Sequence, residues 1–156
     1  MIPLVARHLY SAKITQMLLD YTGYDVNFPF NHDNRTLLVD SLKNQGASCD
    51  TAFLLIERGA DVDSTDKKGF FPLYLAVRNK ALVAARKLLE KGANPNRSFG
   101  EHNLVSLAAS TADYKMLQLL EEFNTDMTAL TPRGKKPIEL VPNYEQFLSC
   151  MILSHK

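Results

Sequence analysis

The side chains that most often perform catalysis are few in this chain and are spread along its 156 residues. The histidines and cysteines are His8, His32, His102, His155, Cys49 and Cys150. No two histidines stand four residues apart, which is the spacing by which a metalloprotease helix holds zinc. The chain also has no Cys-x-x-Cys pair for a zinc site. The sequence therefore predicts no metal site and no cofactor.

A nucleophilic set can be drawn from Cys49, His32 and Asp50, but it has none of the local signatures of cysteine hydrolases. The stretch SFGEHN contains one glycine and lacks the Lys-Ser/Thr that completes a phosphate-binding P-loop. Glu121 and Glu122 are better explained as a solvated helix face than as a paired acid and base. No catalytic residue is assigned, and the prediction is a protein that is not an enzyme.

Bulk composition points to an ordinary folded domain. Hydrophobic residues make up 46% of the chain and charged residues 22%, and the net charge of +1 offers no global field for nucleic acid. Apolar runs of four or five residues are too short to cross a membrane. Two distant cysteines do not make a disulfide framework, so we expect a reducing, cytoplasmic compartment.

A recurring sequence pattern organises the chain. The ending LLIERGADVD recurs as LLEKGANPN, which places Gly59 and Gly92 one period apart. Gly23 stands slightly more than one period before Gly59, and Asn124 occupies the glycine slot slightly less than one period after Gly92. A turn signature with a proline, GFFPLYLA, also has echoes along the chain. The period is about 33 residues, a length that is typical of solenoid proteins.

These motifs resemble the ankyrin repeat family. Its pattern is Asp-x-x-Gly-x-Thr-Pro-Leu-His-x-Ala, followed by a second helix that ends Leu-Leu-x-x-Gly-Ala-Asp-x-Asn. Residues 66–96 fit this pattern without a gap, residues 103–128 fit it more loosely, and the resemblance covers essentially the whole chain. It implies an all-α repeat fold, an α-solenoid of about five stacked helix-turn-helix units with short β-hairpin or turn tips.

Each part of the best-fitting repeat has a physical reason. Asp66 to Gly69 predicts a turn, because glycine takes positive φ without steric cost. Pro72 predicts the first turn of a helix, where its missing N–H loses nothing. Gly92 predicts the end of the second helix. The spacing of Gly69 and Pro72 therefore starts a helix just past a hairpin tip.

We expect one domain over residues 1–156, with repeats near residues 2–30, 31–64, 65–97, 98–130 and 131–153. From Leu37 to Leu54 the second repeat has two residues too many, which we assign to the loop KNQGASCD, residues 43–50. The last repeat has Pro142 at its helix break and no glycine ending, as suits a terminal cap.

The family's Thr and His slots are mostly filled by other residues. Phe71 and Tyr74 occupy them in the third repeat, and Asn103 and Ser106 in the fourth. In the family those Thr and His side chains make local hydrogen bonds. Apolar packing must therefore replace them in places.

Charge is distributed unevenly along the repeats. Residues 64–97 hold eight Lys or Arg against two acidic residues, whereas residues 98–130 hold one against five. The resemblance implies a concave groove lined by hairpin tips and first helices. By position, its partner-binding residues are Lys67, Lys68, Phe70, Arg78, Asn79, Phe99, His102, Ser110, Thr111, Arg35, Arg133 and Lys135. Phe70 and Phe99 are expected to be exposed anchors beside lysines.

The resemblance implies a protein–protein interaction module that is monomeric on its own and binds an acidic or mixed-charge peptide or domain. The family recurs in effectors of intracellular bacteria and viruses, so a host-directed effector in the host cytosol is compatible with it. No nucleic acid or membrane partner is expected. The alternatives are an enzyme or protein modifier on a repeat scaffold, anionic-ligand binding through the basic third repeat, and a self-associating structural protein.

Overall fold

The computed structural model describes residues 11–43, 49–140, 145 and 149. Proximity of Cα atoms divides the chain into two compact units, Met1–Ala93 and Asn94–Lys156, called here the N-terminal unit and the C-terminal unit. The single domain expected over residues 1–156, with its five repeat boundaries, stays a prediction. The expected turn at Pro3 and the expected helix break at Pro142 lie outside the described residues.

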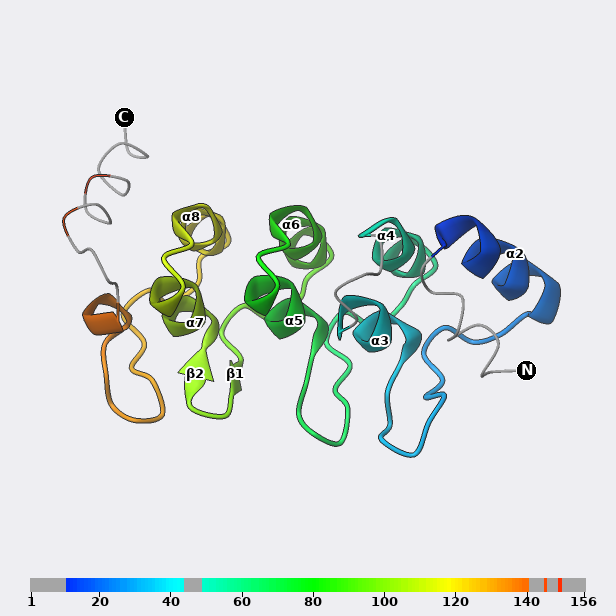
Figure 1. Cartoon of the computed structure of the whole chain (residues 1–156), viewed down its shortest axis with the longest axis horizontal. Coiled ribbons are helices and arrows are strands. Elements are labelled where there is room, and N and C mark those ends of the chain that lie inside the picture. The colour runs from blue at the N-terminus through cyan, green and yellow to red at the C-terminus, as the bar shows by residue number, and fades with distance from the viewer. Residues whose placement is uncertain (1–10, 44–48, 141–144, 146–148, 150–156) are drawn as a thin grey trace. The chain divides into compact units, whose positions relative to one another are not determined.

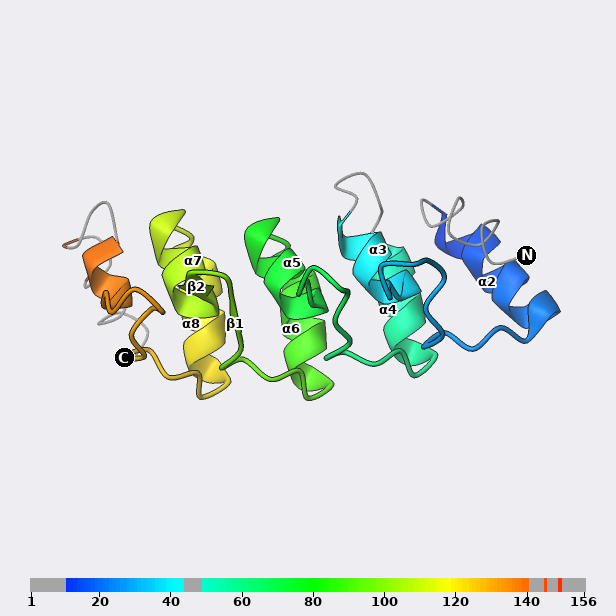
Figure 2. The ribbon, with the colours of Figure 1, turned by 90° about the horizontal axis from the view of Figure 1, so that it is seen from below.

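The N-terminal unit consists of helices in two layers. The first layer holds α3 (Leu37–Lys43) and α5 (Pro72–Arg78), which pack on each other. The second layer holds α2 (Ala12–Thr22), α4 (Cys49–Glu57) and α6 (Leu82–Glu90), with α4 packed against both neighbours. Figures 1 and 2 show that the loops before α3 and α5 extend beyond the first layer.

Helix α5 begins as the sequence predicts. Pro72 is its first residue, and Phe71 precedes it without a side-chain hydrogen bond to the helix. Phe71 is instead buried, with its ring centroid 5.9 Å from that of Tyr74. Apolar packing of Phe71 therefore takes the place of the hydrogen bond of the Thr slot in this repeat, and every residue of α5 before Arg78 is buried.

Helix α6 ends in the turn expected at Gly92, whose φ is 90°. The Gly92 N–H donates to Leu89 O at 3.0 Å, and the Ala93 N–H donates to Leu88 O at 3.0 Å. This is the Schellman arrangement, which satisfies the last carbonyls of a helix. The glycine slot thus has the role that its recurrence predicts.

The two surplus residues of the second repeat lie where they were expected. Residues 44–48 connect α3 to α4, whereas residues 79–81 connect α5 to α6. The first connection is therefore two residues longer, while its conformation lies outside the described residues.

The C-terminal unit contains β1 (Ser98–Phe99), β2 (His102–Asn103), α7 (Leu104–Ser110), α8 (Tyr114–Glu122) and the 3-10 helix η1 (Pro137–Leu140). Strands β1 and β2 pair antiparallel, with Ser98 opposite Asn103. Helix α7 packs on α8, β2 and η1. Asn124 has a φ of 55°, so asparagine fills the glycine slot in the left-handed conformation.

One hydrogen bond recurs with the sequence period. After each second helix, a side-chain oxygen accepts the backbone N–H two residues on at 2.9 Å, and the acceptors are Asp25, Asp61, Asn94 and Asp126. The sequence repeat is thus also a repeat of local structure, and the fold is an all-α repeat solenoid. Among the described residues, no helix is long and apolar enough to cross a membrane.

Candidate partner-binding surface

The tip of the third repeat is held closed by Asp66. Its Oδ1 atom accepts the N–H groups of Lys68 at 3.0 Å and Phe70 at 2.9 Å. The Lys67 N–H donates to Asp33 O at 2.7 Å, which joins this tip to that of the second repeat. Because these N–H groups are satisfied internally, the positive charge that the two lysines offer a partner is that of their side chains.

The other carboxylate oxygen of Asp66 lies in a group of charged residues, called here the Asp66 cluster. The Asp66 side chain is 0% exposed, and its Oδ2 atom lies 3.7 Å from Lys43 Nζ and 3.9 Å from Arg35 Nε. Arg35 also contacts Asp40 Oδ1 at 3.0 Å and Asp33 Oδ2 at 3.6 Å. Arg35, a predicted partner-binding residue, is therefore occupied by three carboxylates and only 18% exposed.

Two further predicted residues of this surface are partly buried. Phe70 is half-buried rather than exposed, because Lys43 Nζ lies 4.4 Å above its ring and Tyr74 packs beside it. The Asn79 side-chain amide donates to Leu42 O at 2.7 Å and so connects α5 to α3. The predicted residues that stay exposed on the N-terminal unit are Lys67, Lys68 and Arg78.

On the C-terminal unit, the structure pairs Phe99 with His102 across the β1–β2 hairpin, and both are half-buried. Phe99 is therefore also not the exposed anchor that was expected. Ser110 and Thr111 are exposed at the end of α7, where their hydroxyls donate to Leu107 O at 2.9 and 3.3 Å.

Arg133 and Lys135 lie exposed on the last tip. The Arg133 guanidinium pairs with the Glu101 carboxylate of the β1–β2 hairpin, which links two tips of the C-terminal unit. The Lys135 N–H donates to Thr131 Oγ1 at 3.1 Å. The predicted set is thus divided between two surfaces, one on each unit.

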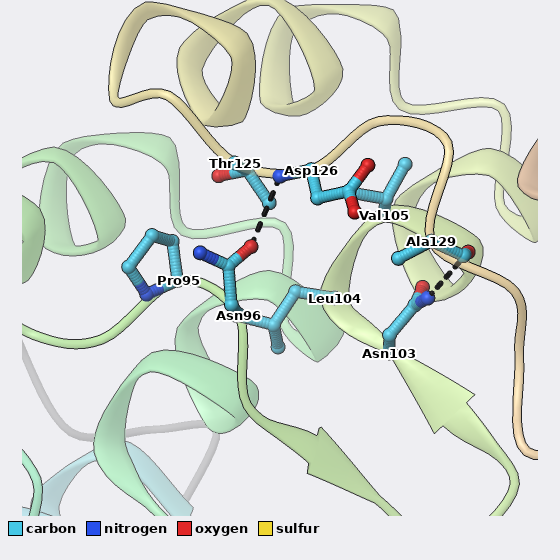
Figure 3. Close-up of a pocket in the computed structure, with 8 residues that line it drawn as sticks. All are labelled: Pro95, Asn96, Asn103, Leu104, Val105, Thr125, Asp126 and Ala129. Atoms are coloured by element: carbon cyan, nitrogen blue, oxygen red, sulfur yellow. Dashed lines mark hydrogen bonds between the residues drawn. The ribbon is translucent and has the colours of Figure 1, made fainter.

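The C-terminal unit also has a pocket of about 350 Å³ (Figure 3). It is lined by Pro95, Asn96, Asn103, Leu104, Val105, Thr125, Asp126 and Ala129. Asn96 Oδ1 accepts the Asp126 N–H at 3.0 Å, and Asn103 Nδ2 donates to Ala129 O at 3.0 Å. Two asparagines therefore connect the walls of this pocket.

The pocket's one carboxylate is that of Asp126. The Thr128 hydroxyl donates to it at 2.7 Å and the Thr128 N–H at 2.9 Å. These hydrogen bonds hold the pKa of Asp126 below its ordinary value. It is therefore an ionised acceptor near neutral pH, not a general acid poised to give up a proton.

The second-layer helices α4 and α6 of the N-terminal unit, called here the outer helices, form ion pairs with each other. Lys87 Nζ lies 2.6 Å from Glu57 Oε1, and Lys91 Nζ lies 3.7 Å from it. The hydrogen bond and charge of Lys87 lower the pKa of Glu57, and Glu57 raises the pKa of Lys87 in return. These contacts border a pocket of about 250 Å³ lined by Phe53, Glu57, Val83, Arg86, Lys87 and Glu90.

The residues considered for catalysis are not brought together by any described contact. His32 is exposed at a tip, and Cys49 is half-buried at the start of α4. No group of three metal-binding side chains occurs in the part of the chain that the structure describes. His8, Cys150 and His155 lie outside that part.

The Asp66 cluster was missed by sequence reasoning. Its members come from two tips and from helix α3, at Asp33, Arg35, Asp40, Lys43 and Asp66. Such a group is defined by the packing of neighbouring repeats. The available signal was the alternation of acidic and basic residues through the second repeat, which does not show burial.

The match to a family model agrees with this geometry. The model of the family described as ankyrin repeats in three copies matches residues 4–99 and 43–131. The chain belongs to the ankyrin repeat family. Ankyrin repeats are in general protein–protein interaction modules, and the family is typically non-enzymatic.

Three curated relatives share parts of the sequence. The human Ankyrin repeat and SOCS box protein 9 is 41% identical over 71 residues, covering 46% of this chain and 24% of the relative. Its mouse counterpart is 32% identical over 88 residues, covering 56% and 30%. A putative ankyrin repeat protein of fowlpox virus (strain NVSL) is 23% identical over 103 residues, covering 64% and 17%. The chain thus spans less than a third of the length of each of these relatives.

Proposed function

We propose that this chain is a non-enzymatic binding module that holds a partner protein against its hairpin tips and first helices. The observation that carries the proposal is the contrast among cations of the N-terminal unit. Lys67, Lys68 and Arg78 are exposed and form no ion pair within the described residues, whereas Arg35 and Lys43 are paired in the Asp66 cluster. On the described tips and first helices of this unit, the uncompensated positive charge therefore lies on the tip of the third repeat and at the end of α5.

The partner that fits this surface is an acidic or mixed-charge peptide or domain. The tip is fixed by the hydrogen bonds of Asp66 and by the bond from Lys67 to the second repeat, so binding requires little ordering of the protein. The contacts would be made by exposed ammonium and guanidinium groups. Their strength should consequently fall with added salt.

A discrete phosphate or other small anion is less well supported. A built anion site has several backbone N–H groups aimed at the ligand. At this tip the N–H groups of residues 67–70 all donate to protein acceptors. The basic third repeat therefore offers side-chain charge over an area, which suits a protein surface.

The exposed side chains of the C-terminal unit form a second proposed contact surface. It includes the exposed residues Ser110, Thr111, Arg133 and Lys135. Phe99 and His102 of the β1–β2 hairpin belong to the same surface but are half-buried. The pocket between Asn96 and Asn103 lies on the same unit and could receive one apolar side chain of a partner. Arg133 is already paired with Glu101, so its contribution should be smaller than that of Lys67 or Lys68.

Similarity to known proteins bears on the cellular role. The fowlpox relative supports a host-directed effector acting in the host cytosol, although it is 23% identical over 103 residues. The similarity to the human and mouse relatives is equally compatible with a resident protein of an animal cell.

The proposal is tested by selecting binders from a displayed library of random peptides with the whole chain as bait. The selected peptides are then titrated against the wild type, K67E/K68E and K13E/K115E. The control variant changes the net charge equally, but Lys13 and Lys115 are exposed on α2 and α8, away from the tips.

We expect the selected peptides to be rich in Asp and Glu and to bind K67E/K68E at least about 10-fold more weakly, since close charge pairs contribute over ~1 kcal/mol at interfaces. Binding to K13E/K115E should stay within about 3-fold of the wild type, because charges far from the binding surface are largely screened by salt. Equal affinity for both variants would reject the tip as the binding surface.

A further inference from the structure

Helix α2 exposes a stripe of large apolar side chains. Ile14 is 42% exposed, Met17 63% and Tyr21 85%. Steps of three and four residues place these side chains along one side of a helix, in the spacing of a helix–helix seam. Thr15 and Leu19 lie on the opposite, buried side. The α2 stripe, meaning Ile14, Met17 and Tyr21, is therefore apolar surface that lies outside the buried core formed by the described residues of this unit.

The same positions of the other second helices are mostly polar. Each second helix is followed by a left-handed glycine or asparagine, at Gly23, Gly59, Gly92 and Asn124, which aligns them. The equivalents of the stripe are Asp50, Phe53 and Glu57 in α4, Val83, Arg86 and Glu90 in α6, and Lys115, Gln118 and Glu122 in α8. Only α2, among the described second helices, is apolar at all three positions.

The spacing of the stripe indicates what can cover it. Apolar residues at this spacing pack best against a second helix that brings a matching row of side chains. Lys13 in the first turn and Asp20 in the last turn stand seven residues apart, so both flank the same side of the stripe. A helix that fits must therefore be apolar and offer an acidic group near one end and a basic group near the other.

We propose that the α2 stripe is a self-association surface, on which α2 of a second copy of this chain packs antiparallel. In that orientation Lys13 of each copy lies beside Asp20 of the other, and the contact occurs twice by symmetry. Lys13 also approaches the C-terminal end of the other α2, where a cation is favoured by the helix dipole. In a parallel pair, by contrast, the like-charged ends would meet.

Both charged groups are accessible for this contact. Lys13 is exposed and forms no ion pair within the described residues. Asp20 already contacts Arg58 Nη1 at 2.8 Å, but its side chain is still half-exposed. A carboxylate can accept from both cations, so the intramolecular pair does not prevent the intermolecular one.

The contact should be weak. Three side chains from one short helix give less than the ~800 Å² per partner of a standard interface, so we expect a reversible dimer with a Kd of about 10⁻⁴ M. The stripe lies on a second helix, whereas the proposed partner surface consists of tips and first helices. Self-association through α2 would replace the sequence-based expectation of a monomer.

The test is sedimentation equilibrium of the full chain from about 10 to about 500 µM, a range that brackets the expected Kd. The average mass should rise from 17.5 kDa toward twice that value as the concentration increases. M17E/Y21E should stay monomeric, because it places glutamates on the stripe without disturbing a buried side chain. Leu130, exposed on the C-terminal unit, supplies the control L130E, which should associate like the wild type.

A charge swap tests the antiparallel orientation. K13E alone and D20K alone should each associate more weakly than the wild type, because both contacts become repulsive in either homodimer. An equimolar mixture should recover association, since the two substituted side chains then meet with opposite charges while the second pair keeps its native Lys13 and Asp20. Failure of the mixture to recover would overturn the antiparallel pairing.

The remaining outcomes are equally decisive. A wild type that stays monomeric throughout overturns the proposal, including the case in which α2 is covered by a helix of another protein. Association of M17E/Y21E at wild-type strength, or loss of association in L130E, would place the contact on another surface. Circular dichroism of each variant would show that its helices are intact.

Discussion

The two units secure the starts of their repeats with different chemistry. In the N-terminal unit, Asp66 closes a tip and places its second oxygen between Arg35 and Lys43, in a partly buried charged cluster. In the C-terminal unit, Asn103 caps α7 by accepting the Ser106 N–H at 2.7 Å and donates to Ala129 O at 3.0 Å. A neutral amide thus makes a helix cap and a cross-repeat contact at Asn103, whereas a charge network closes the tip and joins two repeats at Asp66.

The difference has consequences for stability and for binding. A buried carboxylate needs compensation by nearby cations, so removing one member of the Asp66 cluster weakens the compensation of the others. An asparagine depends only on two backbone partners. The Asp66 cluster also pairs Arg35 and Lys43, so on the described tips and first helices of this unit the free positive charge lies on Lys67, Lys68 and Arg78.

The largest effect should come from Asp66→Ala. It removes two tip hydrogen bonds and the buried carboxylate that faces Arg35 and Lys43, so we expect a loss of about 3 kcal/mol in the free energy of unfolding. Urea denaturation measures it. Asp66→Asn is the matched control, because it keeps the Oδ1 acceptor while losing the charge, and it should cost less. A loss below about 1 kcal/mol for Asp66→Ala would mean that the cluster does not stabilise the tip.

Asn103→Ala should have a smaller effect. It removes the cap of α7 and the bond to Ala129, for an expected loss of about 1–2 kcal/mol in the free energy of unfolding. Asn103→Ser retains a capping oxygen and should recover part of the loss. If Asn103→Ala proves as costly as Asp66→Ala, the contrast between the charged and the neutral solution does not hold.

The smallest effect is expected at the exposed pair of Glu57 and Lys87. Because Lys87 lowers the pKa of Glu57, the pair's stabilisation is present above the unfolded pKa of Glu57 and is lost as the pH falls through the folded one. Because Glu57 raises the pKa of Lys87, it is lost again as the pH rises through the raised Lys87 value.

Glu57→Gln should therefore be slightly less stable than the wild type only between these two pKa values. Thermal melts of both proteins across the pH range would measure this, with the curves converging at either extreme. A difference that persists in acid would show that Glu57 acts through packing instead of charge.

Much of the fold could be predicted from the sequence because local rules determine it. Pro72 marks the start of a helix, Gly69 the turn of a tip and Gly92 the end of a helix. Asn124 takes the left-handed conformation of the glycine slot although it is not a glycine. The surplus of two residues could be placed because its spacing was measured between recognisable positions.

The candidate surface was predictable only in part. Position within a repeat indicates a face, but it does not reveal which neighbour a side chain contacts. Arg35 is drawn into the Asp66 cluster, Phe70 lies under Lys43, and Asn79 binds the carbonyl of Leu42. These contacts arise from packing between repeats, as does the exposure of the α2 stripe, whose spacing alone resembles that of a core-facing helix.

The proposed partner surface consists of the tips and first helices, and NMR titration of the labelled chain with a peptide selected against it tests this directly. We expect the largest shift changes at the amides around Lys67, Lys68 and Arg78, with little change on α4 and α6. Shift changes concentrated on those outer helices, with the tip unaffected, would contradict it.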